Sequence, residues 1–417
     1  MVDMAKSDDL GEPENSDVTD TGEPSAIPKR VFAQKFTAEQ QAKRAGQEQY
    51  TKAVLKVWET RRTARREALL ARADAVRAAT KEYSLLGLGG KYEEVRFEDV
   101  RIRTPFVRLN PKRPLRAPGE KYDRSTDLDT RPASTRLINR KNSALRVLMS
   151  AIYVAHLEFE AGKTSVNKHP NVFVEPELAP WWKLCGLHVK PTSPARMNRE
   201  RGRALNRALS VLHAVGLVHT GSDPVAGRFK NWILNSEARN GRRYTVPAER
   251  RSPETVRVPR AFFARGWHLV LEPGEIATFL AIVEFTQRME GQPRSSKKDI
   301  GVALGETIRW ERYGLSEDTY LEAIHVLDEF GLIDVFDPMP NRRRGKLNPS
   351  RNLIPADEES DEQVPYRVIY PPPPDSVTAP FATDAVDVVL SRLAYPVPLW
   401  LEDLPVDDRV AERLLGK

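Results

Sequence analysis

The stretch ALSVLHAVGLV occupies residues Ala208–Val218, and a similar stretch, AIHVLDEFGLI, occupies residues Ala323–Ile333. The apolar positions and the glycine recur at an offset of 115 residues. The apolar spacing is that of one helix face, and glycine can adopt the left-handed conformation that ends a helix. Leucine and β-branched residues follow the glycine and favour a strand. The repeat therefore predicts two helices that each stop at a glycine and continue into a β-hairpin.

Another helix precedes each of these endings, because apolar residues recur there with helical spacing. The helices are expected at 145–160, 195–215, 273–289 and 316–330, with return strands of the hairpins at Arg228–Asn235 and Tyr366–Tyr370. The leading helices are offset by 131 residues, so the first unit carries about 16 extra residues in its middle. The expected fold class is mainly α with small β-hairpins (α+β), built as a duplicated unit.

Composition divides the chain into five segments. Residues 37–83 contain no proline and are rich in Ala, Glu, Lys and Arg, which predicts a long helix that Gly87–Gly90 would end. A short strand is expected at Val95–Arg103. The segments are a disordered acidic tail at 1–28, a basic helix and connector at 29–139, a first unit at 140–250, a second unit at 251–374 and a C-terminal helical tail at 375–417.

The second unit contains two motifs, Gly-Leu-Ser-x-x-Thr at Gly314–Thr319 and Ala-x-x-x-Leu-x-x-x-Gly-Leu-Ile at Ala323–Ile333. On these residues the second unit resembles the winged helix-turn-helix superfamily. Two such units after a basic N-terminal region resemble plasmid replication initiators with paired winged helices. The resemblance covers about residues 140–370 and implies that Ser316 caps the second recognition helix and that Thr319 faces DNA.

The positive charge is concentrated in the middle of the chain. The formal net charge is +7, and the sequence pI is near 9.3. Residues 29–250 carry 44 Lys and Arg against 22 Asp and Glu, whereas residues 1–28 and 251–417 are both net acidic. A basic block of this kind favours an anionic polymer as partner, and double-stranded DNA is the partner that we predict. Solvated Arg-rich helices are the alternative interpretation.

The two glycine-stopped helices differ in charge. The second carries five carboxylates between residues 316 and 330 and no Lys or Arg, so phosphates would repel it from a DNA groove. The N-terminal half of the first is basic, and in winged helices that half meets the bases. Its predicted DNA-binding residues are Arg196, Asn198, Arg199, Arg201, Arg203 and Arg207.

The hairpins supply further predicted DNA contacts. In the first unit these are Arg228 and Lys230, at the start of the return strand. In the second unit a basic cluster follows Pro340 and would lie in an exposed wing that contacts phosphates. The cluster consists of Arg342, Arg343, Arg344 and Lys346. A solvated loop or a docking site for another protein is the alternative.

No pattern in the sequence indicates catalysis. A phosphate-binding Gly-x-x-x-x-Gly-Lys-Ser/Thr loop is missing, and the seven histidines show no metal-ligand spacing. Cys185 lies among apolar residues and is expected to be a packed core thiol. Trp181-Trp182 is expected in the core as well, with a stacking surface for bases as the alternative. We therefore predict no enzyme activity, no catalytic residue, no cofactor and no metal site.

The remaining expectations concern the helical arginines and the cellular context. Arg61-Arg62 and Arg65-Arg66 share a helix face and suit either nucleic acid or an acidic partner, including the acidic tail of the chain itself. Neither a signal peptide nor a membrane span is visible, and the single cysteine fits a reducing cytoplasm. The predicted function is a DNA-binding, plasmid-type replication initiator in the cytoplasm, associated with nucleoid or plasmid. A transcriptional regulator and a protein–protein assembly factor are the alternatives, and a homodimer remains open.

Overall fold

The computed structural model describes most of the chain between residues 38 and 395. The described ranges are 38–89, 97–109, 131–138, 143–173, 178–190, 193–221, 227–238, 240–248, 255–290, 301–336, 366–372 and 381–395. The chain divides into two units, residues 1–49 and residues 50–417. Of the first unit, residues 38–49 are described and are helical. All contacts given below lie within residues 50–417.

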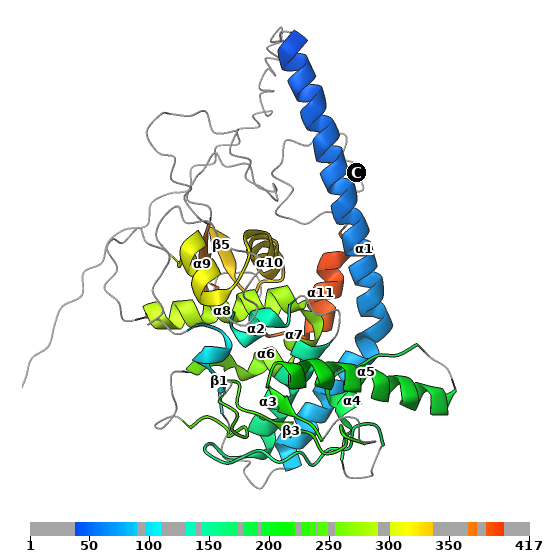
Figure 1. Ribbon diagram of the computed structural model, residues 1–417. Coiled ribbons are helices and arrows are strands. Elements are labelled where there is room, and N and C mark those ends of the chain that lie inside the picture. Colours follow the sequence, from blue (N-terminus) through cyan, green and yellow to red (C-terminus); the bar gives the residue numbers. More distant parts are fainter. Residues whose placement is uncertain are drawn as a thin grey trace, which may run out of the picture. The chain divides into compact units, whose positions relative to one another are not determined.

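The fold is mainly helical with small antiparallel sheets, as the sequence predicts (Figure 1). Among the residues that the structure describes, the five long helices are α1 (Ala38–Gly89), α3 (Ala144–Glu158), α5 (Pro194–Ala214), α8 (Pro273–Met289) and α10 (Glu317–Glu329). The shorter helices are η1 (Thr104–Phe106), α2 (Ala133–Arg136), α4 (Trp181–Leu184), α6 (Arg260–Ala264), α7 (Trp267–Val270), α9 (Glu306–Tyr313) and α11 (Ala385–Leu393).

The first repeat contains α3, α4, α5 and a hairpin. Strand β2 (Val218–His219) pairs antiparallel with β3 (Ile233–Leu234). Backbone bonds continue this small sheet, because Tyr244 N donates to Leu234 O at 2.9 Å and an isolated bridge joins Thr164 to Thr245. The predicted helices at 145–160 and 195–215 and the predicted hairpin after Gly216 are therefore confirmed. The return strand was predicted at Arg228–Asn235 but is formed by Ile233–Leu234, because residues 227–231 form a turn that carries Arg228 and Lys230.

The second repeat has the same order of elements: α8, α9, α10 and a hairpin. Strand β5 (Asp334–Phe336) pairs antiparallel with β6 (Arg367–Ile369), and Val302 bridges to Val368 beside them. At Gly301, φ is 73°, and a Cβ would lie 2.7 Å from Val368 O, so the close approach of the two backbones requires glycine. The predicted helices at 273–289 and 316–330 and the hairpin after Gly331 are confirmed.

The C-terminal ends of α5 and α10 are each determined by a glycine. Gly216 has φ of 76° and Gly331 has φ of 73°, both in the left-handed region. In each case the residue after the glycine donates its N–H back to the helix, from Leu217 to Leu212 O and from Leu332 to Leu327 O. This is the backbone arrangement that ends a helix at glycine, as the repeat in the sequence predicts.

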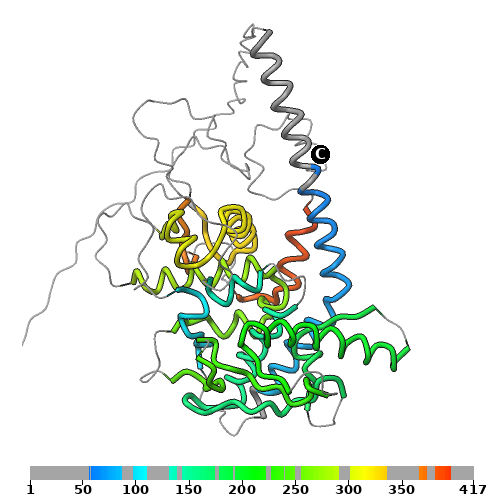
Figure 2. Tube along the Cα trace, viewed as in Figure 1, coloured from blue at the N-terminus to red at the C-terminus, as the bar shows by residue number. Residues whose placement is uncertain are grey.

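Both repeats and the long helix share one hydrophobic core. The apolar stripe of α1 is buried in it, with Leu69 and Val76 each 1% exposed. Strand β1 (Asp99–Arg103) pairs antiparallel with β4 (Thr255–Pro259), with Val100 opposite Val258. The Cα trace in Figure 2 shows α1 and α11, far apart in sequence, side by side, and Arg77 binds Asp387 at 2.8 Å between them. The strand predicted at 95–103 is thus confirmed over residues 99–103.

Two of the buried histidines, His156 and His268, have strongly shifted pKa values. Burial lowers the pKa of His268 to about 3 and the pKa of His156 to about 4. His268 Nε2 lies 3.3 Å from Ser150 Oγ and 3.2 Å from Tyr83 Oη, where a neutral ring can accept a hydrogen bond. His156 Nε2 accepts a hydrogen bond from the backbone N–H of Arg101 at 3.3 Å. Both rings are therefore neutral in the folded protein near pH 7.

These histidines predict a loss of stability in mild acid. Below about pH 6.5 these histidines are protonated in the unfolded chain but stay neutral in the folded chain. The free energy of unfolding therefore falls as pH drops from about 6.5 to about 4. Each buried histidine contributes up to about 1.4 kcal/mol per pH unit to that slope. We expect His268→Gln to reduce the slope by about this amount in urea unfolding at a series of pH values. The exposed His188, changed to Gln, is the control. Equal slopes in the two variants would contradict this account.

Candidate nucleic-acid interface

Helix α5 has a buried face and a basic face on opposite sides. Its buried side chains are Leu205, Ala208, Leu209 and Leu212. With 3.6 residues per turn, four arginines fall on the opposite face, and all four are exposed. We call them the arginine stripe: Arg196, Arg199, Arg203 and Arg207. The stripe is about 16 Å long from the helical rise, and four cations at that spacing can neutralise neighbouring phosphates.

The stripe carries little compensating negative charge. Arg203 Nη1 lies 3.1 Å from Glu200 Oε1, and both side chains are exposed, so solvent weakens this pair. Arg196, Arg199 and Arg207 form no ion pair within the part of the chain that the structure describes. Their guanidinium groups are therefore available to an anionic ligand.

The first two turns of α5 extend beyond the core. At the 115-residue offset of the repeat, the start of α10 at Glu317 corresponds to Gly202, so α5 begins eight residues earlier. Residues 193–199 are exposed or half-buried, and Figure 1 shows one end of α5 extending past the elements beside it. Its first turn holds no acidic residue, and no side chain caps it. The positive end of the helix dipole adds to the charge of the stripe.

Arg201 and Asn198 differ from the stripe. The guanidinium of Arg201 lies 3.6 Å from the centroid of the half-buried Trp182 ring, a cation–π contact. Asn198 is exposed, and its Oδ1 accepts a hydrogen bond from Arg201 Nη1 at 3.4 Å. Arg201 therefore attaches the projecting part of α5 to α4. Trp181 is 3% exposed and belongs to the core, as predicted.

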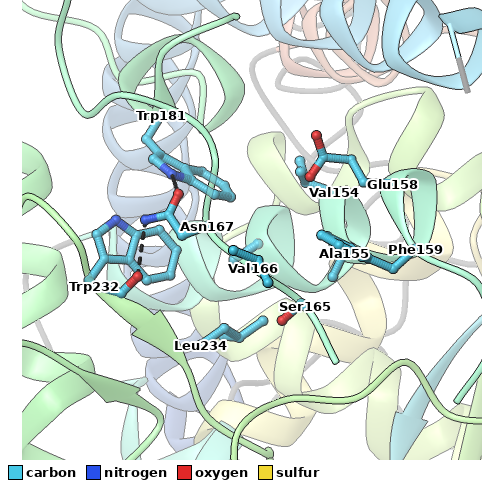
Figure 3. A pocket seen from close by; sticks show the side chains of 11 residues that line it. Val154, Ala155, Glu158, Phe159, Ser165, Val166, Asn167, Trp181, Trp232 and Leu234 are labelled. Carbon is cyan, nitrogen blue, oxygen red and sulfur yellow. Dashed lines mark hydrogen bonds between the residues drawn. The ribbon is translucent and has the colours of Figure 1, made fainter. Parts of the chain in front are cut away.

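A polar network fixes the segment between α3 and α4. Trp181 Nε1 donates to Asn167 Oδ1 at 2.7 Å, and Asn167 Nδ2 donates to Trp232 O at 3.0 Å (Figure 3). Asn171 bridges the same tryptophan and the hairpin, because its Oδ1 accepts from Trp232 Nε1 and its Nδ2 donates to Phe229 O. The hollow beside these residues measures about 20 Å³, room for about one water molecule.

The hairpin of the first repeat adds basic side chains near α5. Lys230 is exposed. Arg228 is half-buried, with Nη2 3.5 Å from Ser210 Oγ of α5 and its guanidinium 4.5 Å from the Phe229 ring centroid. The predicted DNA contacts Arg228 and Lys230 therefore lie on the element that packs next to the basic helix.

Two exposed arginines were not among the predicted site residues. Arg242 and Arg243 follow a turn at Asn240-Gly241, where φ of Gly241 is 71°, and Arg243 bridges to Asn235 beside β3. The sequence contains a signal for this turn, because Asn-Gly between strand-forming residues marks a tight hairpin turn. These two residues add exposed positive charge to the first repeat.

Helix α10 offers no comparable surface. Within residues 317–329 only Glu317 and Asp318 are exposed. Ser316 caps the helix, as predicted, by accepting a hydrogen bond from Thr319 N at 3.3 Å. Thr319 is half-buried, and its hydroxyl lies 2.8 Å from Ser316 Oγ. Thr319 thus takes part in the helix cap, and the DNA contact that the resemblance implies for it stays a prediction.

The acidic side chains of α10 bind arginines of α1. Arg62 forms a two-bond pair with Glu329, with both distances 2.8 Å and both side chains buried. Arg61 pairs with Glu322 at 2.9 Å on the surface. One turn farther along α1, Arg65 forms a two-bond pair with Glu275 of α8. Three of the four helical arginines therefore bind acids within the chain, and Arg66 is exposed.

The remaining predicted residues separate into two groups. The basic cluster Arg342, Arg343, Arg344 and Lys346 lies outside the described residues, and its contact with phosphates stays a prediction. Cys185 is 1% exposed, and burial raises the pKa of its thiol to about 12, which fits the predicted core thiol.

The described part of the chain contains no helix with the length and apolar character that a membrane crossing requires.

Comparison with known proteins finds no matching family model, no similar curated protein and no similar solved structure.

Proposed function

We propose that this chain is a double-stranded DNA-binding protein of the winged-helix class, and that α5 is its DNA-contacting helix. The observation that carries the proposal is the arginine stripe on the exposed face of α5, opposite the buried face. Such a helix can lie against a groove with its arginines toward phosphates and base edges. Lys230, Arg242 and Arg243 are exposed and add positive charge to the same repeat.

The winged-helix assignment rests on the order of elements in both repeats. Each has a leading helix, a bridging residue, a second helix, a glycine-stopped helix and a hairpin, and the bridging residues are Thr164 and Val302. Helix, short strand, helix, helix and two-stranded wing is the order in winged-helix units. In this proposal β2 and β3 form the first wing, and β5 and β6 form the second.

The two repeats have different roles in this proposal. α5 reads DNA, whereas α10 is a structural helix whose carboxylates anchor α1. The burial of α10 and its pairs with Arg61 and Arg62 support this division. The biological role that we propose is plasmid-type replication initiation, which rests on the resemblance of the paired units, and transcriptional regulation is the alternative.

The division of labour can be tested with single substitutions. DNA selected from a random library by the wild-type chain serves as the probe, and fluorescence anisotropy gives the affinity. Arg199→Ala and Arg203→Ala should each weaken binding by about 1–3 kcal/mol, the range for a lost base contact. Glu317→Ala and Asp318→Ala, on the exposed start of α10, should change it by less than about 0.5 kcal/mol. The reverse pattern would assign recognition to α10 and refute the proposal.

A further inference from the structure

Arg201 lies on a different side of α5 from the arginine stripe. With 3.6 residues per turn, its side chain is about 160° around the helix from that of Arg199. It is close in direction to the buried Leu205, which follows one turn later, and it is half-buried itself. Arg201 therefore continues the buried side of α5 into the part of the helix that projects beyond the core.

The guanidinium of Arg201 rests on an aromatic ring that is itself fixed. It lies 3.6 Å from the centroid of the Trp182 ring. Trp182 Nε1 donates a hydrogen bond to Val172 O at 3.2 Å, and Trp182 N donates to Asn171 O at 3.3 Å. Asn171 in turn donates from Nδ2 to Phe229 O in the hairpin at 2.8 Å. The segment between α3 and α4 thus holds the ring on which Arg201 is stacked.

The residue after Arg201 contacts the same segment. A Cβ at Gly202 would lie 3.2 Å from Val172 Cγ2, so glycine allows the two segments to approach closely. Glycine in the middle of a helix also weakens that helix, because it adds backbone freedom to the unfolded chain. Arg201 and Gly202 therefore join α5 to its neighbours just before the helix leaves the core, at a point where the helix is intrinsically weak.

The part of α5 before this point carries half of the arginine stripe. Arg196 and Arg199 lie there, and no side chain caps the first turn. The end of a helix frays readily when it has few contacts, because its first N–H groups have no partners within the helix. A frayed end has to become helical before it can bind DNA as a helix. The apparent affinity then falls in proportion to the helical fraction in the free protein.

We propose that Arg201 is a positioning residue. Stacked on Trp182, it keeps the projecting turns of α5 helical, so that Arg196 and Arg199 are aligned for phosphates before DNA arrives. Arg201 itself makes no contact with DNA in this proposal. The inference rests on the proposed function of α5 and adds to it how the binding helix is held ready.

A salt titration on a random-sequence duplex distinguishes positioning from contact. Arg201→Ala should weaken binding about fivefold, the size of a cation–π contact in partial contact with solvent. The slope of log affinity against log salt should stay that of the wild type, because the complex still forms every phosphate contact. A direct phosphate contact of Arg201 would instead make the slope shallower by about 0.9.

Variants of Trp182 test whether Arg201 acts through the ring. Trp182→Leu keeps an apolar side chain without an aromatic face, and it should weaken binding as much as Arg201→Ala does. The double variant should lose no more affinity than either single variant, because both remove the same contact. Trp182→Phe retains a ring and should retain most of the affinity.

Hydrogen exchange in the free protein gives a second measurement that does not involve DNA. The backbone amides of residues 197–201 should exchange about fivefold faster in Arg201→Ala than in the wild type, because the end of α5 opens more often. Arg131→Ala is the matched control. Its guanidinium lies 4.6 Å from the centroid of the Trp310 ring in the second repeat, and its loss should change neither this exchange nor DNA affinity.

The outcomes separate this inference from the proposed function. If the wild type binds DNA and Arg201→Ala flattens the salt slope, or if its effect adds to that of Trp182→Leu, Arg201 is a DNA contact and only the positioning role fails. Unchanged affinity and exchange in Arg201→Ala would also refute the positioning role. If the wild type does not bind DNA at low salt, the proposed function fails as well. Thermal unfolding shows whether each variant is folded, and should Trp182→Leu not fold, the slope and exchange of Arg201→Ala decide.

Discussion

Replacing Arg62 by alanine is expected to lower the free energy of unfolding by about 3–5 kcal/mol, the typical cost of removing one partner from a buried ion pair. Its side chain is 5% exposed and that of Glu329 is 1% exposed, so the substitution leaves a carboxylate buried without its cation. Arg62 also donates to the backbone oxygens of Arg392 and Tyr395, at the C-terminal end of α11. One side chain thus joins α1, α10 and α11.

Urea unfolding monitored by circular dichroism measures this effect. Arg66→Ala is the control, because Arg66 lies on the next turn of α1 and is exposed, and it should change stability by less than about 0.5 kcal/mol. The double variant Arg62→Ala, Glu329→Ala should lose less free energy of unfolding than the two single variants together, by about 0.5–3 kcal/mol, because neither charge is then buried without its partner. If Arg62→Ala and Arg66→Ala have equal stabilities, Arg62 does not anchor α1.

The helices and hairpins of the two repeats could be predicted from the sequence because their signals are local. The glycines at 216 and 331 end helices through their own left-handed conformation, and the apolar spacing before them selects the buried face. The leading helices recur at an offset of 131 residues and the glycines at an offset of 115, and the early start of α5 accounts for eight of the 16 residues between these two values. The positions of Arg196, Arg199, Arg203 and Arg207 on the exposed face also follow from helical spacing.

Contacts between distant segments could not be predicted in this way. The arginines of α1 suited a nucleic acid or an acidic partner equally well, and the tertiary fold decides between these by bringing Glu329 and Glu275 to Arg62 and Arg65. The pairing of β1 with β4 joins residues more than 150 positions apart, and no local pattern encodes it. Arg201 was predicted to bind DNA like the other arginines of the basic helix. Its contact with Trp182 could not be predicted, because that contact depends on how α4 packs.

The second large effect concerns the arginine stripe. The variant in which Arg196, Arg199, Arg203 and Arg207 are all alanine should lose about three orders of magnitude in affinity for duplex DNA at moderate salt, since each lost contact costs at least about 1 kcal/mol. All four side chains are exposed, so folding should be unaffected. A variant with Lys56, Arg66 and Lys81 replaced by alanine removes exposed positive charge from α1 and is the control.

The most direct test of the central claim, that α5 binds DNA through this stripe, is a salt titration of both variants and the wild type on a random-sequence duplex. Phosphate contacts do not depend on sequence, so no target site is required. We predict that the slope of log affinity against log salt becomes shallower by about 3–4 for the stripe variant, close to 0.9 per lost phosphate contact, and stays unchanged for the control. A slope that is the same in the wild type and the stripe variant would contradict the claim.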